Sequence, residues 1–292
     1  MDYEIIIQIL IGGVLMGGLY ALVAFGLSLI YGVARVLNFA HGTLLAVCGI
    51  AAAVMFATLG WHPAILALIL APIFFVFGFG YYIALLAPLK RRNHFEATIG
   101  TVLVTVGTLI IVSDVAAALA GPNPRNIRLP FAAIEVGEIV VSLTQLYILA
   151  GIVALTFALH VVLTRTWFGR AVRAVTQDAF GAAICGVASA RIHALTFGLG
   201  CAIVAIAGIL YAMNFPVDPY SGFNLTVKAF TIIVLGGIGS LPGSLLAGIL
   251  LGSAEAFTAF YWAPEWAPAL SIVLLLVILV VAPGGIAGWK RA

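Results

Sequence analysis

The feature that most restricts the fold is a series of long apolar runs separated by short polar segments. About 20 consecutive apolar residues can cross a bilayer as an α-helix, in which the interior backbone N–H and C=O groups are paired. Of the 292 residues, 64% are hydrophobic and 8% are charged, whereas a soluble domain has about 25% charged residues. We therefore predict an all-α polytopic membrane protein.

The apolar runs predict about eight or nine transmembrane helices, several of them broken by Gly or Pro. The expected spans are 5–31, 44–59, 64–86, 98–120, 142–163, 194–212, an interrupted segment 228–256 that continues to 261, and 270–281. Between spans, IEVGEIVVSL (134–143) forms at most a short strand-like hairpin. No intervening segment is long enough for a second folded unit, so residues 1–292 are expected to form a single transmembrane domain.

The positions of the basic residues predict the orientation, because Lys and Arg gather in cytoplasmic loops. Three are expected outside, namely Arg125, Arg128 and Lys228. The other ten are expected inside, at Arg35, Lys90, Arg91, Arg92, Arg165, Arg170, Arg173, Arg191, Lys290 and Arg291. This distribution places the C-terminus in the cytoplasm. The net charge of +3 is too small and too dispersed for nucleic-acid binding.

Residues 164–192 form a basic stretch between two apolar runs. Within it, Asp178 suits the N-terminus of a short helix, Gly186 is a natural stop, and Ser189 is suited to cap the next helix. The apolar face of the short helix consists of Ala179, Ala183 and Val187, with Phe180 and Ile184 beside them. Such a helix either lies on the bilayer surface or enters a groove on a cytoplasmic partner. An Ala-rich face with one Phe is a weak lipid anchor, so the second interpretation fits better.

The segment YGVARVLNFAHG (31–42) places Arg35, Asn38 and His41 between two apolar runs. Polar side chains at membrane depth often mark a translocation path. The alternative is a cytoplasmic turn, in which Arg35 follows the positive-inside rule and His41 is merely solvated. The residues alone leave both interpretations open and slightly favour the turn.

Glycines interrupt the later apolar segment at Gly236, Gly237, Gly239, Gly243 and Gly248, together with Pro242. Such interruptions point to a translocation path, and a tight cytoplasmic turn between two ordinary spans is equally compatible with them. LGGIGS is not a phosphate-binding loop, because no Lys follows it. Near the N-terminus, Gly13 and Gly17 have GxxxG spacing, which we interpret as close helix packing within the fold rather than a separate dimer motif.

Several stretches together resemble one protein family. They are GRAVRAVTQDAFGAAICGV (169–187), ALTFGLG (194–200), AIAGIL (205–210), NFAHG (38–42), KAF (228–230) and VLGGIGSLPG (234–243). The chain is similar to the permease subunits of branched-chain amino-acid (hydrophobic amino-acid uptake) ABC importers, and the resemblance extends over most of its length. It departs from that pattern at Gln177 and Thr43, where relatives often carry an acidic residue.

The resemblance implies a single transmembrane permease domain, 1–292, whose coupling loop at about 164–192 docks on a separate ATPase. The ATPase-coupling residues that it implies are Gly169, Arg170, Arg173, Asp178, Ala179, Phe180 and Gly186. The expected translocation-pathway residues are Asn38, His41, Gly236, Gly237, Gly239 and Ser240.

By the same resemblance, the substrate is a branched-chain amino acid delivered by a periplasmic binding protein. Because of the departure at Thr43, urea or short amides are an alternative substrate class. The expected partners are ABC ATPase subunits, a second homologous permease (identical or not) and the lipid of the bacterial inner membrane. The chain is expected to be a transport subunit and not an enzyme, with no metal or cofactor of its own. ATP and Mg would bind the partner subunits, because Lys90, Lys228 and Lys290 lie in no P-loop motif.

Other classes of function have less support. A secondary transporter needs ion-coupling carboxylates near mid-membrane, and only Asp114 and Glu255 lie inside predicted spans, both toward the outer side. An intramembrane enzyme would need a partner for His41 or His160, and no Ser, Cys or Asp stands at a usable spacing. The three cysteines, Cys48, Cys185 and Cys201, show neither disulfide nor metal spacing. A passive channel for small neutral solutes is a further alternative function.

Overall fold

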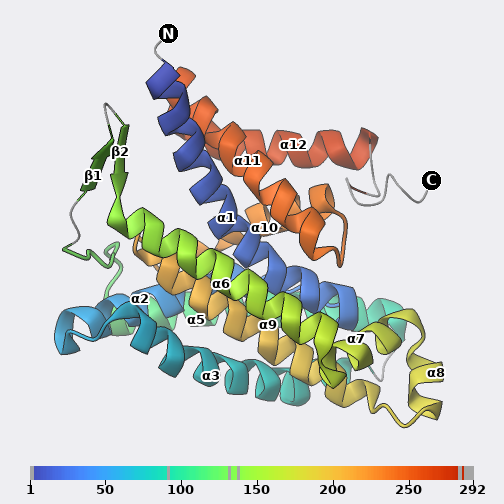
Figure 1. Cartoon of the computed structure of the whole chain (residues 1–292). Helices are drawn as coiled ribbons and strands as arrows, with labels where there is room; N and C mark the ends of the chain where they lie inside the picture. The colour runs from blue at the N-terminus through green and yellow to red at the C-terminus, as the bar shows by residue number, and fades with distance from the viewer. Residues whose placement is uncertain (1–2, 91–92, 131–132, 137–138, 282–284, 286–292) are drawn as a thin grey trace.

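The computed structural model describes residues 3–90, 93–130, 133–136, 139–281 and 285, and within them the chain is a bundle of long helices (Figure 1). The first half contains α1 (Tyr3–Ala34), α2 (His41–Leu59), α3 (Pro63–Tyr81), the π-helix η1 (Tyr82–Leu86), α4 (Ala87–Leu89), α5 (His94–Ala120), β1 (Ala133–Val136) and β2 (Ile139–Ser142). The second half contains α6 (Leu143–Arg165), α7 (Trp167–Gln177), α8 (Ala179–Ile184), α9 (Ser189–Ala212), α10 (Gly222–Gly236), α11 (Leu241–Tyr261), the 3-10 helix η2 (Pro264–Trp266) and α12 (Ala267–Val281).

Seven helical segments are long and apolar enough to cross a membrane, and two shorter apolar helices, 222–236 and 264–280, accompany them in the described part of the chain. Together these helices agree with the predicted eight or nine spans and confirm an all-α polytopic membrane protein. The strands β1 and β2 pair antiparallel, with Val136 opposite Ile139, as the short hairpin expected at 134–143. Figure 1 shows this hairpin at the end of the molecule away from α7 and α8.

Helices α1 and α9 form the centre of the bundle, and glycines let their neighbours approach closely. A Cβ atom on Gly26 would lie 2.8 Å from the Gly200 carbonyl oxygen, where α1 crosses α9. At the contact between α1 and α11, a Cβ on Gly17 would lie 2.5 Å from the Gly248 oxygen, and one on Gly13 would lie 2.7 Å from the Ser253 Cα. The GxxxG pair therefore packs within the fold, as predicted, because only glycine leaves room for the facing backbone.

The chain doubles back between α1 and α2. Helix α1 ends at Ala34, and Arg35 adopts a left-handed conformation with φ of 53°. Helix α2 then begins beside the middle of α1, where the His41 Nε2 atom lies 3.0 Å from the Val23 carbonyl oxygen. Helix α10 also begins at this level, since the Gly42 N–H donates to Thr226 Oγ1 at 2.9 Å.

The position expected for Lys228 is wrong. The residue lies within α10, its side chain is only 14% exposed, and its Nζ atom is 2.8 Å from Glu255 Oε2 on α11. Counting basic residues in loops misplaces it, because a lysine inside a bundle is retained when a carboxylate neutralises it. The other two residues expected outside, Arg125 and Arg128, do lie in the segment between α5 and β1.

Candidate functional site

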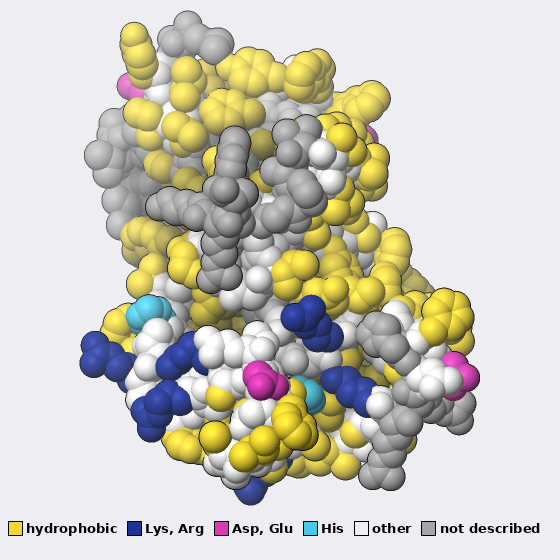
Figure 2. Space-filling view, turned by 90° about the vertical axis from the view of Figure 1, so that its right-hand side faces the viewer, with side chains coloured by type: hydrophobic (Ala, Val, Ile, Leu, Met, Phe, Trp, Pro, Cys, Tyr) yellow, Lys and Arg dark blue, Asp and Glu magenta, His cyan; other side chains and the backbone are white. Residues whose placement is uncertain are grey.

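Exposed basic side chains cluster at one end of the molecule, which we call the basic end (Figure 2). They come from the ends of α1, α4 and α6, from α7, and from the start of α9. The exposed members are Arg35, Lys90, Arg165, Arg170, Arg173 and Arg191. Of the other residues predicted inside, Arg91, Arg92, Lys290 and Arg291 lie outside the described residues. This end carries the segment that the sequence predicts to be a coupling loop.

Helix α7 lies flat against the basic end and was not anticipated from the sequence. Thr166 caps it by accepting from the Gly169 N–H at 3.3 Å. The face formed by Ala171, Val172 and Val175 is buried, and the helix contacts α6, α1 and α9. The alternation of these apolar residues with Arg170 and Arg173 at a period near 3.6 was the signal for an amphipathic helix.

The predicted coupling residues on α7 occupy two different environments. Arg170 and Arg173 are exposed, and an Arg173 guanidinium N–H donates to the Leu163 carbonyl at the end of α6. Gly169, in contrast, is buried, and a Cβ at this position would collide with the Leu163 carbonyl. Gly169 therefore shapes the turn between α6 and α7 rather than lying on the exposed surface.

The short helix predicted between Asp178 and Gly186 is confirmed as α8. The Asp178 carboxylate accepts from the Phe180 N–H at 2.9 Å and so caps the helix. Gly186 ends it in a left-handed conformation, with φ of 82°. The prediction that Ser189 caps the next helix is wrong: Ala188 is the N-cap residue of α9, and Ser189 Oγ donates to the Ala179 carbonyl at 3.2 Å. The hydroxyl reaches the preceding helix, so it ties α8 to the start of α9.

Helix α8 presents apolar side chains to the outside of the basic end. Phe180 is 76% exposed and Ile184 is 74% exposed, whereas Ala182 is buried on the opposite face. Ala179 is also exposed. Neighbouring large apolar side chains exposed beside basic residues form a candidate interaction site. We call the pair Phe180 and Ile184 the apolar knob.

Asn38 and His41 are buried beside α1, so the interpretation of a solvated turn is wrong for them. The Asn38 side-chain oxygen accepts from the Ala40 N–H at 3.1 Å, while its Nδ2 atom is buried without a hydrogen-bond partner. The imidazole of His41 packs against Gly26, where an added Cβ would lie 2.9 Å from the ring. Because both side chains are buried and His41 packs against α1, any pathway role would require the helices to move apart.

The glycine-rich interruption is a tight turn between α10 and α11. Gly237 and Gly239 both have positive φ, 89° and 79°, and Ser240 caps α11 by accepting from the Gly243 N–H at 3.1 Å. Gly236 packs directly against Gly243. The Gly239 N–H donates to Ser28 Oγ on α1 at 3.1 Å. This turn and the Asn38–His41 segment therefore both pack against α1, the turn at Ser28 and His41 at Val23.

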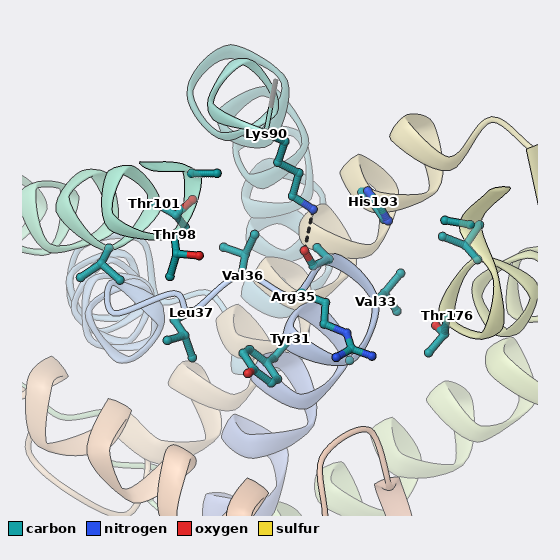
Figure 3. Close-up of a pocket in the computed structure, with 16 residues that line it drawn as sticks. Tyr31, Val33, Arg35, Val36, Leu37, Lys90, Thr98, Thr101, Thr176 and His193 are labelled. Atoms are coloured by element: carbon teal, nitrogen blue, oxygen red, sulfur yellow. Dashed lines mark hydrogen bonds between the residues drawn. The ribbon is translucent and has the colours of Figure 1, made fainter. Parts of the chain in front are cut away.

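A cavity of about 780 Å³ opens at the basic end, and we call it the vestibule. It lies between the segment that follows α1, the start of α5, and helices α7 and α8. Figure 3 shows Lys90 and Arg35 on one side of it and Thr98 and Thr101 on another, with the dashed line joining Lys90 Nζ to the Ala34 carbonyl at 2.6 Å. This cavity has no local signal in the sequence, because its walls come from five separate parts of the chain.

A polar cluster inside the bundle was also missed. Lys228 Nζ donates to Glu255 at 2.8 Å and to the Tyr20 hydroxyl at 2.9 Å. The second Glu255 oxygen accepts from the Ser271 hydroxyl on α12. The cluster thus joins α1, α10, α11 and α12. Two opposite charges alone in apolar segments, at Lys228 and Glu255, were the signal that could have predicted their pairing.

A bundle of membrane-length helices with an amphipathic helix and an exposed apolar knob at its basic end defines a polytopic membrane protein with a candidate docking surface. The comparisons with known proteins give the family. Residues 9–279 match the family described as "Branched-chain amino acid transport system / permease component", and the chain belongs to it.

Two named relatives cover nearly the whole chain. The high-affinity branched-chain amino acid transport system permease protein BraD of Pseudomonas aeruginosa is 34% identical over 264 residues, which are 87% of this chain and 86% of that protein. The corresponding permease protein LivH of Escherichia coli K12 is 32% identical over 302 residues, covering 97% and 95%.

A solved structure shares the fold. PsaBC from Streptococcus pneumoniae, in complex with a Fab, superposes with a TM-score of 0.50 at 14% identity, covering 98% of this chain and 94% of that one. At this identity the likeness concerns the arrangement of helices alone.

Proposed function

We propose that the chain is the transmembrane permease subunit of an ABC importer that carries branched-chain amino acids across the bacterial inner membrane. The relatives BraD and LivH, named for high-affinity branched-chain amino acid transport, support the substrate class. The helices of the described residues then act as one transmembrane permease domain, and the basic end faces the cytoplasm.

The apolar knob is the observation that carries this proposal. Phe180 and Ile184 are exposed at the end of the molecule that also carries Arg170 and Arg173. The partner that fits such a surface is a protein whose groove covers the knob and whose acidic groups pair with the arginines. The chain has no P-loop of its own, so a separate ATPase subunit is the partner that fits, and ATP and Mg bind there.

The packing of α7 supplies a mechanical link between this partner and the membrane. Closure of two ATPase subunits on ATP would move α8, and Ser189 and the α7–α8 contact would carry the movement to α9 and α6. Alternating access follows if α1, which α7 also contacts, shifts relative to α2 and α10. Asn38, His41 and the turn at residues 236–240 then become accessible in the open state.

The remaining partners follow from the same proposal. A binding protein docks at the end with the β-hairpin, and a second permease, either a copy or a homologue, completes the transmembrane pathway. An ion-coupled secondary transporter is less well supported, because Lys228 already neutralises Glu255. Thr43, the residue that left urea and amides open, is buried against Gly222 and does not line the vestibule.

The test is the recovery of the intact chain from native membranes in mild detergent, with its partners identified by mass. Recovery of ATPase subunits together with a second permease, and of a binding protein that holds a branched-chain amino acid, supports the proposal. Recovery of the chain alone, repeated in several mild detergents, would overturn it in favour of a self-contained transporter.

A further inference from the structure

The vestibule is built from parts of the chain that meet only at the basic end. Its walls include residues 31–37 at the end of α1 and just beyond it, Lys90, residues 97, 98, 101 and 102 of α5, residues 175, 176 and 179 of α7 and α8, and His193 of α9. A volume of about 780 Å³ is large enough for a small organic molecule with its water.

Two cationic residues, Arg35 and Lys90, line the vestibule. Arg35 takes a left-handed conformation, with φ of 53°, which is unfavourable for a non-glycine residue and is retained only where the surroundings impose it. The ammonium of Lys90 turns back to the Ala34 carbonyl at 2.6 Å and lies 5.7 Å from the centre of the Tyr82 ring. Among the described residues that line the vestibule, none is acidic. The site is therefore electropositive.

The rest of the lining is apolar or carries hydroxyl groups. Val33, Val36, Leu37, Val102 and Val175 provide branched aliphatic surface. Thr98, Thr101 and Thr176 add hydroxyl groups to the same walls (Figure 3). A ligand that matches all of these groups has one anionic head and a short branched hydrocarbon part.

We propose that the vestibule is a cytoplasmic binding site for small aliphatic monocarboxylates, in which Arg35 and Lys90 hold the carboxylate and the valine side chains hold the hydrocarbon. A free amino acid fits less well, because its ammonium group finds no acidic partner in this lining. A 2-oxo acid, the product of transaminating a branched-chain amino acid, carries the carboxylate without the ammonium.

Occupancy has a consequence for transport, and this consequence rests on the proposed function. The ligand would touch Val175 and Thr176 on α7 while it is held by Arg35 and Lys90. A bound carboxylate would therefore restrain α7 against the end of α1 and slow the movement that couples ATP hydrolysis to uptake.

The experiment measures equilibrium binding of radiolabelled 4-methyl-2-oxopentanoate to the purified full chain in nanodiscs, with leucine as the comparison ligand. We expect saturable binding that is tighter for the oxo acid than for leucine. Arg35→Asn and Lys90→Gln should each weaken it about tenfold or more, because each removes a charge-assisted hydrogen bond. Asn is chosen at residue 35 because it tolerates the left-handed backbone.

Two further variants separate binding from folding. Arg35→Lys keeps the charge and should retain most of the affinity, whereas Arg128→Gln removes an exposed arginine from the opposite end and should change nothing. Absence of saturable binding, tighter binding of leucine, or equal affinity in Arg35→Asn, Lys90→Gln and the unaltered chain would overturn the site.

The regulatory consequence is tested separately in proteoliposomes that contain the complete importer. With 4-methyl-2-oxopentanoate on the side of the ATPase, uptake of leucine should fall in the unaltered importer and stay unchanged in Lys90→Gln. Binding without inhibition would overturn the proposed restraint of α7, while the binding site itself would still be supported. If the importer moves no branched-chain amino acid at all, the proposed function fails, while the binding result on the isolated chain still decides the site.

Discussion

Lys228 and Glu255 form an ion pair of 2.8 Å between α10 and α11, with the carboxylate only 1% exposed. The Tyr20 and Ser271 hydroxyl groups complete its surroundings, one from α1 and one from α12. The pair therefore joins the hairpin of α10 and α11 to the centre of the bundle, where either charge alone would be expensive.

This pair predicts a pattern of stabilities. Lys228→Met should lower the free energy of unfolding by about 3–5 kcal/mol, because it leaves Glu255 charged and buried without a cation. Adding Glu255→Gln to that variant should recover much of the loss, since no unpaired charge then remains. Thermal unfolding in detergent measures both variants, and a double variant no more stable than Lys228→Met would contradict the account.

Two neighbouring glycines on α1 provide a test of the helix packing. A Cβ on Gly13 would lie 2.7 Å from the Ser253 backbone, whereas one on Gly12 would have no atom within 4 Å. Gly13→Ala should therefore destabilise the protein by about 1–3 kcal/mol through overpacking. Gly12→Ala should be neutral or stabilise it by up to about 1 kcal/mol, because alanine favours the helix. Equal melting temperatures for the two variants would show that α1 and α11 do not meet as described.

The apolar knob predicts a defect in coupling. Phe180→Asp should leave membrane insertion and melting temperature unchanged, because the side chain is 76% exposed. It should lower leucine uptake at least about tenfold by placing a charge in a desolvated groove. Asn93→Asp adds the same charge at an exposed position of the basic end outside α7 and α8, and should transport normally. Normal uptake in Phe180→Asp would contradict the assignment of α8 to the docking surface.

Gly169 predicts a different kind of defect. Gly169→Ala should force α7 away from the end of α6, because its Cβ would collide with the Leu163 carbonyl. We expect lower yield or stability and lost uptake, whereas Gly107→Ala, which meets no atom within 4 Å, should retain both. Retention of full uptake and stability in Gly169→Ala would contradict the close packing of this turn.

The vestibule predicts a pH dependence for binding of the carboxylate. Partial burial of the ammonium lowers the pKa of Lys90 to about 8, and Tyr82 and His193 lie beside it. The ligand carboxylate stays ionised over this pH range. Affinity should therefore be highest below about pH 8 and fall as Lys90 loses its proton above it. In Lys90→Gln this fall should disappear, and its persistence there would assign the pH dependence to another group.

Much of the fold followed from the sequence, because apolar length and glycine spacing are local signals. The spans, the GxxxG packing of Gly13 and Gly17 and the short helix between Asp178 and Gly186 all depend on residues within one or two turns. The placement of Lys228 did not follow, since its partner Glu255 is distant in the sequence and the positive-inside rule counts only loops. Ser189 was wrongly predicted to cap α9 for a similar reason, because its hydroxyl donates to the Ala179 carbonyl of the preceding helix.

The candidate site was predicted in part. Exposure of Phe180 could be anticipated from its position in a polar loop, whereas burial of Gly169 depends on how α7 folds back on α6. The vestibule depends on residues from five separate regions, so neither its existence nor the pairing of Lys90 with the Ala34 carbonyl had a local signal.

The most direct test of the importer assignment uses the thiol of Cys185, which follows α8 directly. Cys185 is exposed, whereas Cys48 and Cys201 are buried, so a thiol-reactive photo-crosslinker in native membranes should react at Cys185 alone. Illumination should join the chain to an ATPase subunit identified by mass, and the product should be lost in Cys185→Ser. Efficient labelling with no ATPase among the products would contradict docking at α8 and, with it, the central claim.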